Sequence, residues 1–214
     1  MCRGDGFLKI DKLHFGSWYS NCYVVTSGQG FGKRHAAVVD PAMPCDAILS
    51  HLQDLGANVD AIILTHGHFD HIYYLDELKE KTGACVYIHK DDAEMLADGE
   101  KNAYSFFFGG EFQTKPADVL VSCGDEIKIG DQSLRVISVP GHSKGSICLL
   151  GEGFIITGDT LFSDGFGRYD LHGGDPKALS NSLSKLKSYD KSLMIYPGHG
   201  ESTTLGCALE NIYF

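Results

Sequence analysis

Thr65-His66-Gly67-His68-Phe69-Asp70-His71 is the stretch from which the fold and the chemistry of this chain are inferred. It follows the apolar run at 61–64, which is typical of a buried β-strand. Three imidazoles and one carboxylate therefore stand at a strand end, where a turn at Gly67 directs His66 and His68 to one side. Zinc and similar divalent ions favour imidazole and carboxylate ligands, so the spacing predicts a centre with one or two metal ions. A polar turn with solvated histidines is the alternative.

The composition is that of a globular protein and argues against several classes of partner. The 214 residues are 43% hydrophobic and 21% charged, without a continuous apolar span or an N-terminal signal pattern. We therefore expect a cytoplasmic protein that does not enter a membrane. The formal net charge of -10 disfavours tight binding of nucleic acid or anionic lipid, which depends on a basic surface. A small-molecule substrate is the expected partner, and we expect a monomer or a homodimer.

The cysteines indicate a reducing environment. There are 7 of them, an odd number, and they are scattered along the chain without any Cys-x-x-Cys pair. This usage favours free thiols, as in a cytoplasm. Several cysteines lie inside apolar runs, where we expect them to fill the core.

The first half of the chain alternates predicted strands with predicted helices. Short runs rich in β-branched and apolar residues predict strands at 7–10, 22–26, 36–39, 61–64 and 85–89, with connections at 16–21 and 28–32. Helical spacing of apolar residues predicts helices at 46–55, 72–81 and 91–97. Residues 98–118 interrupt this pattern, because they place Tyr104 and the run 106–108 of phenylalanines among several glycines. We expect a loop there, acting as a substrate lip, a packing plug or a dimer contact.

From Val119 onward the chain is richer in short strands. They are predicted at 119–122, 126–129, 133–139, 147–150, 154–157 and 193–196, with one amphipathic helix at 176–189. No linker or low-complexity tract separates the halves. Residues 1–214 therefore predict a single domain of the α/β (α+β) class, with helices covering two packed sheets in four layers.

Three more predicted strands end in a glycine-bearing turn that is followed by a metal-type ligand. These turns are Pro140-Gly141-His142, Gly158-Asp159-Thr160 and Pro197-Gly198-His199. Because functional groups gather on loops at one edge of a sheet, these turns are expected to meet the stretch at 65–71. Seven groups would then converge, namely His66, His68, Asp70, His71, His142, Asp159 and His199. Asp40 ends another predicted strand, and it is expected either to hold a metal-binding imidazole or to cap the next helix.

Together these motifs resemble those of the metallo-β-lactamase superfamily. The set comprises Thr-His-x-His-x-Asp-His at 65–71, Gly-His-Ser-x-Gly-Ser at 141–146, Gly-Asp-Thr-Leu-Phe at 158–162 and Pro-Gly-His-Gly at 197–200. Asn21-Cys22-Tyr23 and Asp40-Pro41 also fit, so the resemblance covers nearly the whole chain. Within the superfamily the chain is most similar to the short glyoxalase II-like (hydroxyacylglutathione hydrolase-like) enzymes, which lack a C-terminal glutathione-binding helical domain. The resemblance implies a four-layer αββα sandwich of the metallo-β-lactamase type.

The resemblance also implies a binuclear metal-dependent hydrolase. By that resemblance His66, His68 and His142 would hold one divalent ion, Asp70, His71 and His199 a second, and Asp159 would bridge the two. Such a pair lowers the pKa of a shared water to near 7, which supplies hydroxide at neutral pH. Asp70 would act as a catalytic residue by orienting that water. Zinc is the expected metal, with iron or manganese as alternatives.

The expected substrate is a thioester, in particular a glutathione thioester such as lactoylglutathione. A thiolate leaving group, with a pKa of roughly 8.5, needs little help from a general acid. A competing hypothesis comes from Gly167-Arg168-x-Asp170, which is shared with persulfide dioxygenases that use this scaffold with one iron. Arg168 is expected either to bind a substrate carboxylate or to form an ion pair with Asp170. A lactonase, another hydrolase of the superfamily and a non-catalytic metal-binding module are the further alternatives.

Overall fold

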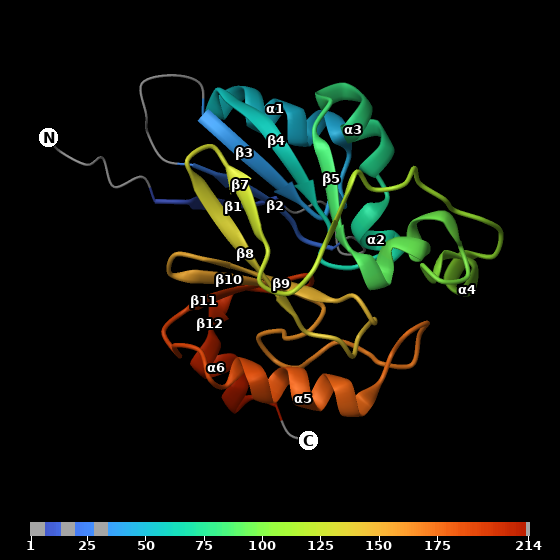
Figure 1. The fold of residues 1–214 in the computed structure, drawn as a ribbon, viewed down its shortest axis with the longest axis vertical. Helices are drawn as coiled ribbons and strands as arrows, with labels where there is room; N and C mark the ends of the chain where they lie inside the picture. The colour runs from blue at the N-terminus through green and yellow to red at the C-terminus, as the bar shows by residue number, and fades with distance from the viewer. Residues whose placement is uncertain (1–6, 14–19, 28–33, 213–214) are drawn as a thin grey trace, which may run out of the picture.

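The computed structural model describes residues 7–13, 20–27 and 34–212. The predicted turn at 28–32 and most of the predicted connection at 16–21 lie outside the described residues, as does Cys2. Two six-stranded sheets pack face to face, and helices cover the outer face of each (Figure 1). The predicted four-layer αββα sandwich is therefore confirmed. Within the described residues no helix combines the length and the apolar character that crossing a bilayer requires.

The first sheet brings two functional loops to one edge. Its strands follow chain order: β1 (Lys9–Leu13), β2 (Cys22–Thr26), β3 (Arg34–Val39), β4 (Ala57–Ile63), β5 (Cys85–His89) and β6 (Val119–Val121). Strands β1, β2 and β3 pair antiparallel, whereas β3 to β6 pair in parallel. The carboxyl ends of parallel strands share an edge, so Asp40 after β3 lies near the stretch at 65–71 after β4.

The second sheet supplies the other loops. Its order is β7 (Glu126–Ile129), β8 (Gln132–Ser138), β9 (Ile147–Gly151), β10 (Phe154–Gly158), β11 (Met194–Pro197) and β12 (Thr203–Thr204). Only the β10–β11 pair is parallel among these described strands, which brings the turns after both strands together. The second sheet begins at β7, because β6 pairs with β5 through Tyr87 and Val119. The change of pattern at Val119 thus precedes the change of sheet by one strand.

Helices flank the sheets as the sequence predicts. Helices α1 (Cys45–Leu55) and α3 (Leu75–Thr82) cover the first sheet, and α5 (Pro176–Leu186) and α6 (Leu205–Glu210) cover the second (Figure 1). Helix α1 ends at Gly56, whose φ of 61° suits a residue without a side chain. Helix α5 begins after Asp175, whose carboxylate accepts hydrogen bonds from the backbone N–H groups of Lys177 and Ala178.

Three local features differ from the prediction. The helix expected at 72–81 is divided into α2 (Phe69–Ile72) and α3, because the N–H of Tyr74 donates to the carbonyl of Pro41 at 3.1 Å instead of continuing the helix. The helix expected at 91–97 is the 3-10 helix η1 (Lys90–Ala97). The loop expected at 98–118 contains a short helix, α4 (Tyr104–Phe108). Helices α2 and α4 lie at the same end of the sandwich (Figure 1).

Alternate residues of the strands face different cores, which explains the four layers. Val24 and Ile62 belong to the core beneath α1 and α3, whereas Val25 and Ile63 belong to the core between the sheets. A third core lies between the second sheet and α5. Side chains alternate along a strand, so a sheet with both faces covered needs nearly continuous apolar runs. Each fully buried Val or Ile side chain contributes about 1.5–3 kcal/mol.

Candidate metal centre

The seven predicted ligand residues come together at one edge of the sandwich. His66 and His68 follow β4, while Asp70 and His71 lie in α2. The other three follow β8, β10 and β11, namely His142, Asp159 and His199. Their ligand atoms form three overlapping groups, each with all atoms within 4.8 Å of one another: His66, His68 and His142; His66, His71 and Asp159; Asp70, His71 and His199.

The first group consists of three buried imidazoles. The Nδ1 atom of His68 lies 2.8 Å from the Nε2 atom of His142, which lies 3.2 Å from the Nε2 atom of His66. Burial lowers the pKa of His68 to about 3, and burial together with the neighbouring imidazoles lowers that of His66 as well. Neutral rings keep the lone pairs that bind a metal. Three nitrogens at about 2.0–2.1 Å from one tetrahedral ion would lie about 3.3 Å apart, close to this spacing.

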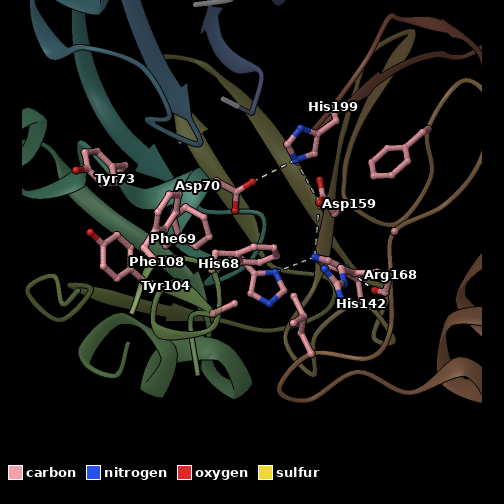
Figure 2. A pocket seen from close by; sticks show the side chains of 15 residues that line it. His68, Phe69, Asp70, Tyr73, Tyr104, Phe108, His142, Asp159, Arg168 and His199 are labelled. Carbon is pink, nitrogen blue, oxygen red and sulfur yellow. Dashed lines mark hydrogen bonds and ion pairs between the residues drawn. The ribbon is translucent and has the colours of Figure 1, made fainter. Parts of the chain in front are cut away.

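Asp159 lies between His142 on one side and His71 and His199 on the other. Its Oδ1 atom is 3.4 Å from the Nε2 atom of His71, and its Oδ2 atom is 3.6 Å from His142 and 3.5 Å from His199. On the far side of His199, Asp70 Oδ2 approaches the Nε2 atom at 3.2 Å. Figure 2 shows Asp159 between His142 and His199. The carboxylate of Asp159 is therefore near both the group of His66, His68 and His142 and the group of Asp70, His71 and His199.

The carboxylates of Asp70 and Asp159 give the candidate centre a negative charge. Burial alone would raise the carboxyl pKa values, but the neighbouring imidazoles, His71 first, hold the pKa of Asp159 at about 2 and that of Asp70 well below its usual range. Burial would lower the pKa of His71, yet Asp159, Asp70 and Asp40 raise it above the usual value. Buried negative charge requires nearby positive charge. Protons on the histidines or divalent cations can supply it.

Several features fit a divalent metal pair. Among the described residues, the Nε2 atom of His71 and the Oδ1 atom of Asp159 are fully enclosed and have no hydrogen-bond partner. Gly198 keeps the space beside them open, since a Cβ atom there would lie 2.1 Å from Asp159 Oδ1 and 2.7 Å from His71 Cε1. Five imidazoles with two carboxylates form a donor set that suits zinc, iron and other borderline ions. We therefore describe this cluster as a candidate metal centre.

Asp40 holds an imidazole, the first of its two predicted roles. Its Oδ2 atom lies 2.9 Å from the Nδ1 atom of His71, and its two oxygens accept hydrogen bonds from the backbone N–H and the hydroxyl of Thr65. The φ of Asp40 is 52°, a left-handed conformation that costs a non-glycine residue about 1–3 kcal/mol. Helix α1 starts after Pro44, so Asp40 does not cap it. The contact turns the Nε2 atom of His71 towards Asp159.

Replacing Asp40 by asparagine is expected to weaken metal binding without removing a ligand. Asn keeps the size but loses the charge that supports the His71 ring, and the loss of such a partner costs about 10–100-fold in metal affinity. Competition with a chelating dye measures this affinity. The control is Asp46→Asn, which removes an aspartate whose side chain is 89% exposed. Equal affinities of the Asp40 variant and the wild type would contradict the orienting role.

Two residues that support the centre were missed by the sequence analysis. The Ser20 hydroxyl donates to Asp70 Oδ2 at 2.9 Å and lies 3.4 Å from the Nε2 atom of His199. Asp92, on η1, is fully buried and accepts hydrogen bonds from the Gly67 N–H, the Ser143 hydroxyl and the Gly145 N–H. Asp92 thereby joins the turn that carries His66 and His68 to the turn that carries His142. No sequence signal distinguishes it from an ordinary acid in a first helical turn.

Arg168 forms the ion pair that was one of its two predicted roles. Its Nε and Nη2 atoms donate to the two oxygens of Asp170 at 2.7 and 2.8 Å. Its backbone carbonyl lies 2.6 Å from the Nδ1 atom of His142, which fixes the orientation of that ring. The side chain also lines the cavity above the centre. Binding of a substrate carboxylate by Arg168 stays a prediction.

A cavity of about 940 Å³ opens above the candidate centre. Its floor includes His68, Asp70, His142, Asp159 and His199. Aromatic residues dominate the rest of the lining, namely Phe69, Tyr73, Tyr104, Phe107, Phe108 and Phe162. Figure 2 shows Phe69, Tyr73, Tyr104 and Phe108 on one side of the centre, across from Asp159 and Arg168. The aromatic segment at 98–118 thus contributes directly to the pocket.

The fold and the site define a class of α/β sandwich proteins with a His- and Asp-rich centre at the edge of two sheets. The profile of the Metallo-beta-lactamase superfamily matches residues 16–199, and the chain belongs to this superfamily. It is thus a metal-dependent hydrolase in the broad sense of that class. The protein is 34% identical to "Probable metallo-hydrolase YqgX" of Bacillus subtilis (strain 168), with 92% of each chain covered.

Solved structures agree with this assignment. The BLEG-1 B3 metallo-β-lactamase is 31% identical, with a TM-score of 0.85 over 94% of this chain and 97% of that one. TTHA1623 in a di-iron-bound form is 32% identical, with a TM-score of 0.79 over 92% and 96% of the two chains. ETHE1 from Myxococcus xanthus is 26% identical, with a TM-score of 0.74 over 92% and 80%. The fold is therefore that of a known superfamily.

Proposed function

We propose that this protein hydrolyses thioesters at a pair of divalent metal ions. The carrying observation is that Asp159 faces two groups of imidazoles at the floor of one cavity. One ion would be held by His66, His68 and His142, and the other by Asp70, His71 and His199. Asp159, which lies near imidazoles of both groups, would be shared. The structure of TTHA1623 in a di-iron-bound form supports a pair, since that relative holds two irons. Zinc remains our proposed metal, with iron as the alternative.

The residues of the chain have distinct roles in this proposal. A pair of bound divalent ions supplies hydroxide at neutral pH and stabilises negative charge on a carbonyl oxygen. Asp70 stays ionised because its pKa is low, and it is oriented by the Ser20 hydroxyl, so it can accept a hydrogen bond from the attacking water. Burial keeps His66 and His68 neutral, as metal ligands must be.

The nature of the leaving group also supports a thioester. A thiol has a pKa of roughly 8.5, so its thiolate departs without a strong general acid. Apart from the candidate ligands, the described lining of the cavity has no carboxylic acid, ammonium or imidazole group that could protonate a leaving group, and a thioester does not need one. Glutathione thioesters such as lactoylglutathione are the first substrates to test, and the partner is then a small molecule.

A second candidate function is persulfide oxidation at a single iron. It is favoured by the Gly167-Arg168-x-Asp170 motif, in which the guanidinium is held at the rim of the cavity by both oxygens of Asp170. In that case one ion position would be used, and oxygen would be consumed. Metal content and oxygen uptake distinguish the two functions.

A substrate panel tests the proposal. The metal-loaded protein is given a thioester, a lactone, a β-lactam and glutathione persulfide, with release of thiol, ring opening and oxygen uptake as readouts. We expect the thioester to be cleaved with the highest kcat/KM and Asp70→Asn to lose most of this turnover. The β-lactam is included because BLEG-1 is described as a B3 metallo-β-lactamase. Persulfide-dependent oxygen uptake without thioester cleavage would overturn the proposal.

A further inference from the structure

We propose that the acyl group of the substrate is an apolar chain or an aromatic ring, which packs against an aromatic wall beside the centre. The wall consists of Phe69, Tyr104, Phe107 and Phe108, all of which line the cavity. This inference rests on the proposed thioester hydrolysis. It specifies that the preferred thioesters carry a hydrophobic acyl group and not a small hydroxyacyl group.

The wall begins at the centre itself. Phe69 stands in the sequence between the candidate ligands His68 and Asp70, and all three line the cavity. Its centroid lies 5.6 Å from that of Tyr104, 5.8 Å from that of Phe107 and 5.5 Å from that of Phe108. These separations are typical of aromatic rings in contact. A group bound at the metals would therefore meet a continuous aromatic surface within the same cavity.

The local structure holds the wall in position. Asn102 is fully buried: its side-chain carbonyl accepts from the N–H of Tyr104, and its amide donates to the carbonyls of Met95 and Phe112. Ala103, which precedes α4, has a φ of 70°. A left-handed alanine is strained, and such strain persists only where surrounding contacts impose it. These contacts fix the orientation of α4, and with it the side on which its aromatic rings lie.

The exposure of the wall is what points to a ligand. Phe107 is 49% exposed and Phe108 is 66% exposed, although both are large apolar side chains. Neighbouring apolar side chains exposed beside a pocket mark a binding surface more often than a structural one. Arg168 also lines the cavity, but its charge is paired with Asp170, and its Cζ atom lies 5.6 Å from the centroid of Phe107. The wall thus favours an apolar occupant.

The size of the cavity supports a substantial acyl group. The volume of about 940 Å³ falls within the range that drug-sized ligands occupy. A lactoyl group has three carbons and a hydroxyl, so it would leave the wall uncovered. An octanoyl or phenylacetyl group would reach from the centre onto the rings. Each methylene that becomes buried is expected to improve binding about three- to fourfold.

The test compares thioesters of one thiol that differ only in the acyl group. Acetyl, lactoyl, octanoyl and phenylacetyl thioesters are assayed with the metal-loaded wild type and with Phe107→Ala and Phe108→Ala. We expect kcat/KM of the wild type for octanoyl to exceed that for acetyl by more than about thirtyfold, as three buried methylenes would give. Each variant is expected to reduce the octanoyl-to-acetyl ratio about tenfold. The control is Phe106→Ala, which alters the same helix at a ring that is 69% exposed and does not line the cavity.

Binding of the product acids separates this inference from the proposed function. Octanoate and acetate carry the same carboxylate, so calorimetry on the metal-loaded protein reports the contribution of the chain even if no thioester is cleaved. Octanoate should bind at least tenfold more tightly than acetate to the wild type, and less so to Phe108→Ala. Thioester cleavage with equal kcat/KM for all acyl groups would contradict acyl binding at the aromatic wall but would leave the proposed thioester hydrolysis intact. Equal affinities of the two acids, or a wild-type dimer that Phe108→Ala dissociates, would also overturn it.

Discussion

Asp159→Asn is expected to abolish most of the activity and to remove at least one of the two bound ions. Among the described carboxylates, only that of Asp159 has one oxygen near His71 and the other near His142. Its replacement therefore removes a candidate ligand from both proposed ion positions at once. Asparagine keeps the shape but lacks the negative charge. Charge stabilisation by metal ions is worth several kcal/mol in the transition state, so a loss of about 4 kcal/mol lowers kcat about a thousandfold.

Steady-state kinetics and metal analysis of the same preparation test this expectation. Asp164→Asn is the matched control, because Asp164 is exposed and lies five residues further along the same connection. It should keep the wild-type turnover and metal content. If Asp159→Asn retained two ions and more than about a tenth of the turnover, the carboxylate would not be shared between the positions.

Removal of metal is expected to destabilise the fold as well as to stop turnover. In the metal-free protein the carboxylates of Asp70 and Asp159 lie near the same two imidazoles in a partly buried site. They raise the pKa values of His71 and His199, and protonation of these rings offsets part of the negative charge. A ligand that binds only the folded state stabilises it by about 4 kcal/mol at a thousandfold excess over its Kd. For a chain of this length that corresponds to a Tm higher by about 8–16 °C.

Thermal unfolding with and without a chelator measures this difference. The chelated protein should recover both its Tm and its turnover when zinc is added back in excess. His66→Ala serves as the internal comparison, since it removes one imidazole from two of the candidate groups and should show a smaller shift on adding zinc. Identical unfolding curves with and without metal, for a protein that is active in both states, would contradict a metal-dependent centre.

The convergence of the seven candidate ligands could be predicted from the sequence because their pattern is local and repeated. Each of His66, His142, Asp159 and His199 follows a strand end with a glycine nearby, and parallel pairing of β3 with β4 and of β10 with β11 places such ends together. The apolar runs likewise predicted most strands, because both faces of each sheet are buried. The sandwich could therefore be predicted from these runs, and the superfamily from the resemblance of the motifs.

What the sequence did not reveal depends on contacts between distant segments. Asp92 acts through Gly67 and Ser143, which are 25 and 51 residues away, so no local pattern marks it. The break between α2 and α3 arises from a hydrogen bond between Tyr74 and Pro41. Helix α6 is short, and β12 contains two residues, so neither has a measurable period. For the aromatic segment, the sequence allowed three roles, and the structure places its rings beside the centre.

The metal content of the protein purified without added metal tests the proposed two-ion centre most directly. Elemental analysis alongside protein quantification gives the number of ions per chain. We predict about two divalent ions, because Asp159 lies 3.4 Å from His71 and 3.6 Å from His142, which belong to different candidate groups. A single iron per chain together with persulfide-dependent oxygen uptake, or a fully active protein without any bound metal, would contradict it.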